Sequence, residues 1–482
     1  MLYRINFFKI FVEQILTSKK LGLIRLVMIN IIAVDSLRNI SITAQAGWIV
    51  ISFYILAAIF FLIPCALLTA EMATGSSDET GGIYIWVKKA FGKRFGFVIL
   101  WLQWVYNLVW FPSICGFFAG VIAYVMAPLL GQNANDLVSN PWYMMSMSLV
   151  MFWSATAINL FGIKTSSTVS TLGAVIGTLL PMIVIILIAF VWSTTHTNNI
   201  TMPSLNDFVP SGNNVGSWAL FITVMFSLFG LEMSAIHAAN VRDAKKNFPR
   251  ALLISGFVIL LTLILSNIAV ILVSEQLEIG DVDIVTGLMV SFHYFFSQIG
   301  MPWLSYFIAI TLIFGAFTTT SAWIMGLSRA FMVVSKDNLL PAVFSQTNKN
   351  DAPDKILVFQ GLIFTIFCFF YIFMPSVHSA YWYLSDLTAQ LAVIAYMGMF
   401  ATALKLKLTQ PLQEGQFEIF KGAIGTFVMS TLGIIGCVIA VVVGFIPLDN
   451  SEMSVLYFDS LLLGGIVLAL VIPYVFTLKM AK

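Results

Sequence analysis

Apolar runs of about 20 residues recur along the whole of this 482-residue chain. A helix of that length crosses the ~30 Å hydrocarbon core of a bilayer. The runs are too long and too uniformly apolar for membrane-barrel strands, which alternate in polarity over about ten residues. Only 10% of the residues are charged, against roughly 25% in soluble domains. The sequence therefore predicts an all-α, multi-pass membrane protein.

Twelve transmembrane spans are predicted, and no stretch between them has the composition of a separate soluble domain. The spans are residues 21–40, 47–72, 95–127, 142–161, 168–193, 217–240, 251–274, 303–334, 356–374, 381–404, 422–446 and 457–478. The preceding segment, residues 1–20, has apolar residues at helical spacing and no signal-peptide architecture. It is predicted to be an amphipathic helix on the cytoplasmic surface.

The distribution of Lys and Arg predicts the orientation. With the N-terminus inside, 23 of the 24 Lys and Arg residues fall at the inner side, and Arg38 alone falls near the outer side. Cytoplasmic loops of membrane proteins carry such an excess of positive charge. Both termini are therefore expected in the cytoplasm, and the protein in the bacterial cytoplasmic (inner) membrane.

Several other functions find no support. GxSxG, HExxH, GxGxxG and phosphate-loop motifs are absent, and the four histidines are scattered, so neither an enzyme nor a metal or cofactor site is expected. The four cysteines lie in apolar spans without CxxC spacing, which disfavours disulfides. A net charge of +2, explained by topology, gives no indication of a nucleic-acid partner.

Two spans are interrupted by polar residues. In the first, only nine residues separate Arg25 from Asp35, or about 14 Å of helix, before the sequence VDSLRN (34–39). In the sixth, Gly230 and Glu232 interrupt the apolar run. Broken helices at corresponding positions of two halves are the pattern of an inverted-repeat transporter, whose substrate site lies between the breaks.

The interruptions divide the chain into repeats. Residues 21–193 are predicted to form the first five-helix repeat, residues 217–404 the second, inverted repeat, and residues 422–478 two additional helices. Peptide groups freed at the breaks suit a small zwitterion, because helix N-termini favour a carboxylate and C-terminal carbonyls favour an ammonium.

Several segments resemble a known family. They are LIPCALLTAEMAT (62–74), GGIYIWVKKAFGKRFGF (81–97), the motif GLExSxxH (230–237), SAWIMGLSRAF (321–331) and KDNLLPAVFSQTNKNDAP (336–353). They are similar to the amino acid–polyamine–organocation (APC) superfamily, and most of all to its bacterial glutamate/GABA antiporters. The resemblance implies twelve helices in a LeuT-like five-plus-five inverted repeat, with discontinuous helices 1 and 6 and two helices added.

The same resemblance implies positions for the site. An amino acid would bind between the breaks of spans 1 and 6, walled by spans 3, 8 and 10. The matching residues are Glu232, Ser234 and His237 in span 6, Trp323 in span 8 and Tyr396 in span 10.

Departures from that branch limit what can be transferred. Thr319 stands where the antiporters carry a glutamate, Ala392 where they carry a tyrosine, and Thr171 where they carry a lysine. The sequence ends at Lys482, just after the last span, so the long C-terminal segment of those antiporters is not expected. Neither the substrate nor acid gating follows from the resemblance.

Glu232 admits two interpretations. A carboxylate at membrane depth costs on the order of 2.5–3.5 kcal/mol and needs a partner, a proton or water. It either lines the pathway, binding a substrate ammonium or gating by protonation, which is the favoured reading, or caps freed amides at the break. Gly230 and Leu231 beside it are further substrate-binding candidates, and His237 is a gating candidate.

Asp35 and Arg38 raise a similar choice. They either pair with each other on one helical face or offer a carboxylate and a guanidinium to the two ends of an amino acid. Asp35 is the stronger candidate, because Arg38 is expected at the outer surface. Ser36 and Leu37 complete the predicted substrate-binding segment.

Span 8 offers a possible coupling site. Thr319 and Thr320 belong to a run of hydroxyl residues, FTTTSAW (317–323), which could bind sodium or simply bond back to their own helix. The sequence thus predicts an amino acid antiporter working by alternating access, with a proton- or sodium-coupled amino acid or polyamine symporter as the alternative. A channel or a scaffold without transport is disfavoured.

Overall fold

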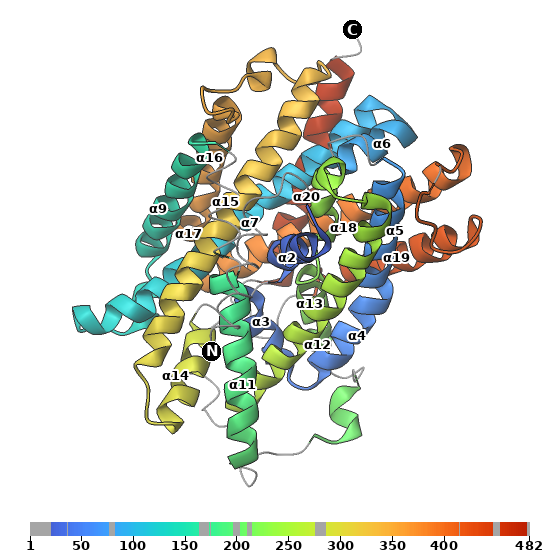
Figure 1. Cartoon of the computed structure of the whole chain (residues 1–482). Coiled ribbons are helices and arrows are strands. Elements are labelled where there is room, and N and C mark those ends of the chain that lie inside the picture. Colours follow the sequence, from blue (N-terminus) through green and yellow to red (C-terminus); the bar gives the residue numbers. More distant parts are fainter. Residues whose placement is uncertain are drawn as a thin grey trace, which may run out of the picture.

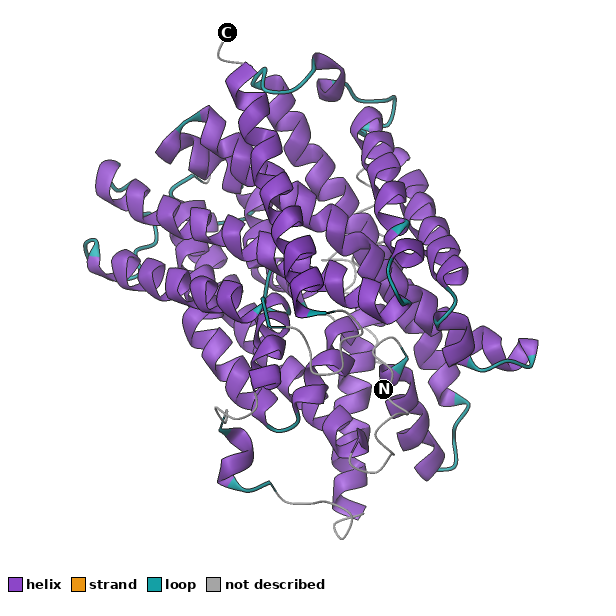
Figure 2. Cartoon of the chain, turned by 180° about the vertical axis from the view of Figure 1, so that it is seen from behind, coloured by secondary structure: helices purple, strands orange, loops and turns teal. Residues whose placement is uncertain are grey.

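The computed structural model describes residues 21–35, 37–76, 82–162, 173, 175–195, 203–209, 215–274, 286–413, 415–446 and 454–479. These residues form helices and no strand. Figure 1 follows the chain through them from blue to red, and Figure 2 shows the bundle from behind. The predicted amphipathic segment, residues 1–20, lies outside the described residues.

Long helices follow the predicted spans closely. In chain order they are α2 Leu23–Val34; α4 Ile49–Ala57, continued through the π-helical turn η3 Ala58–Leu62 into α5 Ile63–Thr74; α7 Lys93–Leu130; α9 Pro141–Leu160; η4 Val175–Leu179 with α11 Leu180–Thr195; α12 Val215–Phe226; α13 Ala244–Ser274; α15 Leu304–Lys336; α16 Asp354–Cys368 with α17 Phe370–Phe373; α18 Val377–Thr409; α19 Ile424–Val443; and α20 Val455–Lys479.

Each of the twelve predicted spans contains a helix. Among the described residues, ten helices are long and apolar enough to cross a membrane. The broken α2 and the less apolar α9 are not among those ten. The all-helical membrane architecture is therefore confirmed, whereas twelve spans remains a prediction.

The first predicted interruption is present. Helix α2 ends at Val34, and Asp35 is extended, with φ −70° and ψ 120°. The chain resumes in three short turns, η1 Leu37–Asn39, α3 Ile40–Thr43 and η2 Ala44–Ala46. Only half a membrane of helix precedes the break, as the position of Asp35 in the sequence indicated.

The second interruption is also present. Helix α12 ends at Phe226, and the chain continues after Gly230 as a ten-residue 3-10 helix, η7 Leu231–Asn240. Gly230 adopts φ +117°, a conformation open to glycine and costly for other residues. A Cβ at this glycine would lie only 3.0 Å from the carbonyl oxygen of Ala33. The second break therefore rests directly on the end of α2.

The two broken segments also meet at their other ends. The amide of Arg242 donates a hydrogen bond of 2.8 Å to the carbonyl of Leu21. Helix α2 packs against η7 and α13 and lies near the centre of the bundle in Figure 1. Around them, α7 packs against α15, α18 and α9, and α18 also packs against α19 and α20.

Glycines permit one very close helix contact. A Cβ added to Gly177 would lie 2.1 Å from the Cα of Gly315, so η4 and α15 touch backbone to backbone. Gly173, four residues earlier, is similarly close to Thr318. Small residues four positions apart permit such a close approach between membrane helices. The four cysteines are buried and free.

Two ion pairs fix helix ends on the side of the bundle where α6 (Ile83–Phe91) lies. Lys407 Nζ lies 2.7 Å from Glu71 Oε1, and Thr426 donates a 2.7 Å hydrogen bond to Glu71 Oε2. This buried cluster joins α5, α18 and α19. The second pair, Lys88 with Asp337, joins α6 to the end of α15.

Candidate functional site

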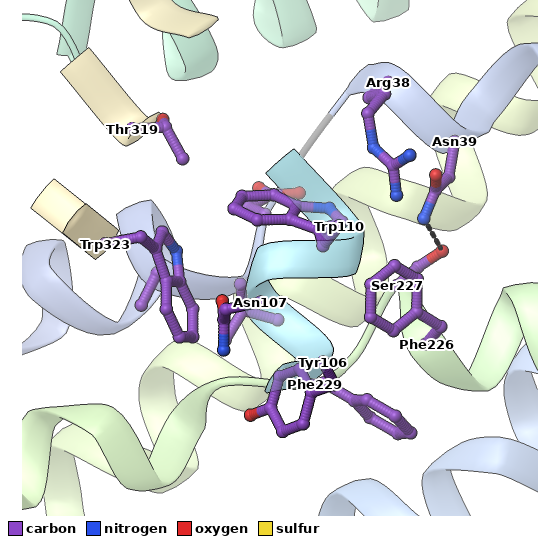
Figure 3. A pocket seen from close by; sticks show the side chains of 13 residues that line it. Arg38, Asn39, Tyr106, Asn107, Trp110, Phe226, Ser227, Phe229, Thr319 and Trp323 are labelled. Carbon is purple, nitrogen blue, oxygen red and sulfur yellow. Dashed lines mark hydrogen bonds between the residues drawn. The ribbon is translucent and has the colours of Figure 1, made fainter. Parts of the chain in front are cut away.

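A cavity opens where the two breaks meet α7 and α15 (Figure 3). The space free of protein atoms here, its opening included, is about 520 Å³. Its lining comes from the first break (Ala33, Val34, Asp35, Arg38 and Asn39), from α7 (Tyr106, Asn107 and Trp110), from the end of α12 and the second break (Phe226, Ser227 and Phe229), and from α15 (Thr319 and Trp323).

Asp35 contributes a carboxylate to this cavity. One of its oxygens, Oδ2, accepts a hydrogen bond of 3.0 Å from the hydroxyl of Thr262 on α13. The other, Oδ1, is buried and has no hydrogen-bond partner among the described residues. A buried carboxylate oxygen without a partner is costly, so Asp35 is suited to receive a donor from a ligand.

Arg38 contributes a guanidinium from the same break. It is 2% exposed, and its Nη1 donates to Ser113 Oγ on α7 at 2.8 Å. Longer contacts of 3.5 Å reach the hydroxyls of Tyr381 and Ser385 on α18. The expectation that Arg38 lies at the outer surface was wrong. The chain bends at Asp35 and runs as short turns within the bundle, which keeps Arg38 inside.

Aromatic rings surround the guanidinium. Its central carbon lies 5.9 Å from the ring centre of Trp110 and 5.6 Å from that of Phe226, within the range of cation–π attraction. Trp110 in turn packs edge-on against Trp323, with ring centres 5.8 Å apart. The cavity is thus mostly apolar, with few charged groups, a composition typical of small-molecule sites.

The two breaks are also joined across the cavity. Asn39 donates a hydrogen bond of 3.3 Å from its side-chain amide to the hydroxyl of Ser227, drawn as a dashed line in Figure 3. Displacement of either break would alter this bond, so the cavity lining depends on how the two broken helices sit together.

A smaller hollow adjoins the main cavity. It shares Asp35, Arg38 and Thr319 with it, and adds Leu37, Gly177 and Thr178 among others. The carboxylate and guanidinium therefore lie at the junction of two spaces, one toward α7 and α12 and one toward η4.

Glu232 lies beside the second break but is not among the residues that line the cavity. Its carboxylate is 3% exposed. Tyr396 donates to Oε2 at 2.5 Å, and Gln103 donates to Oε1 at 3.3 Å. The freed amide of Gly230 donates to the hydroxyl of Tyr396 at 2.9 Å, so the tyrosine links it to the carboxylate. This arrangement stabilises the break, as the capping interpretation requires.

The predicted site residues separate into groups. The main cavity gathers Asp35, Thr319 and Trp323, and Leu37 lines the smaller hollow. Gly230, Leu231, Glu232 and Tyr396 form the second break and its support, outside both linings. The hydroxyl of Thr320 donates to the carbonyl of Ala316 in its own helix at 2.8 Å. Ser36 and the side chain of His237 lie outside the described residues.

Sequence reasoning missed several lining residues. Asn39 follows the predicted segment directly, and Phe226, Ser227 and Phe229 precede Gly230. Their only signal was proximity in sequence to the breaks. The contacts of Arg38 with Ser113 and Ser385 join positions 75 and 347 residues apart, which no local pattern indicates. On α7, Tyr106, Asn107 and Trp110 line the cavity, whereas the nearby Trp101 and Trp104 do not.

Comparison with known proteins assigns the family. A family model described as "Amino acid permease" matches residues 21–470. The chain belongs to the amino acid permease family. This permease is 41% identical, over 96% of its length and 97% of the relative's, to an uncharacterized transporter of Legionella pneumophila.

Relatives with named activities are more distant. This permease is 24% identical to a glutamate/gamma-aminobutyrate antiporter of Lactococcus lactis, covering 88% of the chain and 83% of the relative. It is also 24% identical to a probable agmatine/putrescine antiporter of the same species, covering 86% and 85%. These matches confirm the resemblance to the APC superfamily and its antiporters, and they identify this permease as a transporter.

Proposed function

We propose that this permease is an amino acid antiporter, which exchanges an amino acid or related amine across the bacterial cytoplasmic membrane by alternating access. The observation that carries the proposal is the pair of opposite charges at one broken helix. Asp35 presents an unpartnered carboxylate oxygen, and Arg38 a guanidinium, to one cavity. These groups are complementary to the ammonium and carboxylate of a zwitterion.

The proposed architecture is that of an inverted repeat. Twelve spans form two five-helix repeats of opposite orientation, residues 21–193 and 217–404, followed by two helices in residues 422–478. The breaks after Val34 and Phe226 support this arrangement, because both come at the first helix of a repeat. Both termini lie in the cytoplasm on this assignment.

Antiport is supported by the relatives. The names of the Lactococcus lactis proteins describe exchange of glutamate for gamma-aminobutyrate and of agmatine for putrescine. Asp35 suits the amine that all of these molecules carry. Arg38 suits the carboxylate that only some of them carry.

Exchange can be tested by counterflow. Purified permease is reconstituted in proteoliposomes loaded with one unlabelled amino acid or amine at a time, and uptake of the labelled compound is measured. We expect uptake for at least one compound that carries both an ammonium and a carboxylate. A panel of amino acids and polyamines without any uptake would contradict the proposal. For variants that remove a carboxylate from the site, Asp136→Asn is the matched control, because Asp136 is exposed on the short helix α8 (Ala134–Val138).

Coupled symport is the alternative function. It is supported by Thr319, whose hydroxyl belongs to the predicted coupling segment and which lines the cavity. Symport would drive net uptake into liposomes without internal substrate when a proton or sodium gradient is imposed. Exchange requires internal substrate. Accumulation of substrate by empty liposomes under a sodium gradient would therefore show sodium symport and contradict antiport.

A further inference from the structure

Asp386 is a buried acid that the cavity does not use. It lies nine residues after Val377, the first residue of α18, which places it about 14 Å along the helix. The residue is 3% exposed. Both carboxylate oxygens are buried and have no hydrogen-bond partner among the described residues.

A second acid, Asp459 on α20, faces the same boundary between helices. Its Oδ1 is also buried without a hydrogen-bond partner in the described part of the chain. The ring centre of Phe458, the residue before Asp459, lies 6.4 Å from that of Tyr383, which is one helical turn before Asp386. Helices α18 and α20 pack together here, and Tyr383 Oη donates a hydrogen bond of 3.1 Å to the carbonyl of Leu461. The two acids are therefore held near each other.

The surroundings offer no described cation to this pair. No salt bridge to Asp386 or Asp459 is formed among the described residues. The other titratable neighbours, Tyr383 and Tyr457, are uncharged tyrosines. On α17, Tyr371 donates its hydroxyl to the carbonyl of Pro112. Arg38 contacts the neighbouring face of α18 through Tyr381 and Ser385.

Two carboxylates so placed cannot both be ionised without compensation. Each charge loses its hydration, and the two repel each other in a medium of low dielectric constant. A metal ion would need more ligands, and no group of three or more His, Cys, Asp or Glu residues lies together in the described part of the chain. A single proton satisfies the pair with no further ligand.

We propose that Asp386 and Asp459 form a proton-binding site between α18 and α20, separate from the substrate cavity. The proton resides on Asp386, the more buried of the two, and exchanges with the membrane face at which α20 begins, close to the half-buried Asp459. Ser385, the residue before Asp386, contacts Arg38. Ionisation of the pair therefore acts on the turn of α18 that holds the cavity's guanidinium.

Infrared difference spectroscopy of the purified full-length permease tests this site without a transported substrate. The carbonyl stretch of protonated carboxylic acids is followed while the pH of the buffer is raised, in the wild type, Asp386→Asn, Asp459→Asn and the exposed control Asp136→Asn. We expect a carboxylic-acid band that disappears at high pH in the wild type and the control. Asp386→Asn should lack that band.

Asp459→Asn keeps the proposal testable if Asp386→Asn does not fold. Removal of the neighbouring negative charge eases ionisation of Asp386, so its band should disappear at a lower pH than in the wild type. A band that neither substitution removes or shifts would overturn the proposal. A band that sodium removes at constant pH would also overturn it, because the occupant would then be sodium. Neither result depends on whether the permease exchanges amino acids.

Discussion

Tyr396 and Glu232 join α18 to the second break: the tyrosine hydroxyl donates a 2.5 Å hydrogen bond to Glu232 Oε2. The same hydroxyl accepts a 2.9 Å hydrogen bond from the amide of Gly230. One phenol therefore satisfies both a freed backbone donor and the carboxylate that caps the break. This contact makes the geometry of the broken helix depend on the position of α18.

Glu232→Gln should lower exchange strongly, by at least about tenfold, and leave the protein folded. The amide can fill the same space, but it has no charge and loses charge-assisted hydrogen bonds worth about 1.5–3 kcal/mol. Counterflow rate and elution profile in size-exclusion chromatography measure the two effects. Tyr396→Phe removes a bond to the same carboxylate and provides a matched comparison. If Glu232→Gln exchanges substrate at the wild-type rate, Glu232 only stabilises the break and has no part in transport.

Asp35→Asn should weaken substrate binding by about tenfold to a hundredfold, because a charge-assisted hydrogen bond contributes roughly 1.5–3 kcal/mol. The bond from Thr262 to Oδ2 can persist, so the cavity should keep its shape. The concentration dependence of counterflow gives the affinity. An unchanged affinity for every transported compound would show that Asp35 does not bind the substrate amine.

Arg38→Lys should impair recognition of the carboxylate even though it retains a positive charge. Lysine lacks the planar fork of the guanidinium, which here reaches Ser113 and lies among Trp110 and Phe226. We expect the variant to lose preference for an amino acid over its decarboxylated amine in a competition assay. If both compounds compete as in the wild type, Arg38 serves packing rather than selectivity.

Lys407→Met should lower thermal stability markedly, since it leaves the buried carboxylate of Glu71 without its cation. Breaking one side of a buried ion pair costs about 3–5 kcal/mol. The midpoint of thermal unfolding, followed by fluorescence, should fall far more than in the control Lys355→Met, whose lysine is 55% exposed. Adding Glu71→Gln to Lys407→Met should recover part of the loss, because the uncompensated charge is removed. No recovery would argue against this electrostatic reason.

The contact between α6 and the end of α15 should survive mild acid. Partial burial of Asp337 would raise its pKa, but hydrogen bonds from Lys88 and Tyr84 outweigh that effect and hold the pKa below its ordinary value of 3.8. Burial of Tyr84 itself, together with its hydrogen bond to Asp337, raises the pKa of this tyrosine. A carboxyl with a lowered pKa in the folded state contributes stability above its ordinary value and loses it as the pH falls through the lowered one.

Hydrogen–deuterium exchange of the α6 peptide measures this contact. At pH 5 its protection, corrected for intrinsic exchange rates, should equal that at pH 7, and it should fall only below about pH 3.8, the ordinary value for this acid. Asp337→Asn should lose protection at neutral pH. Loss of protection already at pH 5 in the wild type would contradict the assigned pKa.

The membrane fold was readable from the sequence because apolar length and charge segregation are local signals. Both breaks were readable too, since Asp35 and Gly230 are polar or flexible residues within apolar runs. The 3-10 helix after Gly230 was not predicted, and neither was the inward course of the chain at Arg38. Both depend on tertiary packing, in one case against α2 and in the other against α7 and α18.

The candidate site was only partly readable, for the same reason. Asp35 and Trp323 were identified through the break and the family resemblance, and both line the cavity. Glu232 drew attention as a buried acid, but its distance from the cavity lining depends on bonds to Gln103 and Tyr396 from two other helices. Asp386, equally buried, gave no comparable local signal, because no break or motif surrounds it.

Because Gly230 has no side chain, the second break can lie directly against the end of α2. Even a methyl group there would press on the carbonyl of Ala33 at 3.0 Å and approach the ring of Trp323 at 3.4 Å. Alanine at this position would push the second break away from the end of α2. In the proposed alternating-access cycle, one added carbon atom would therefore favour a single conformation of the permease.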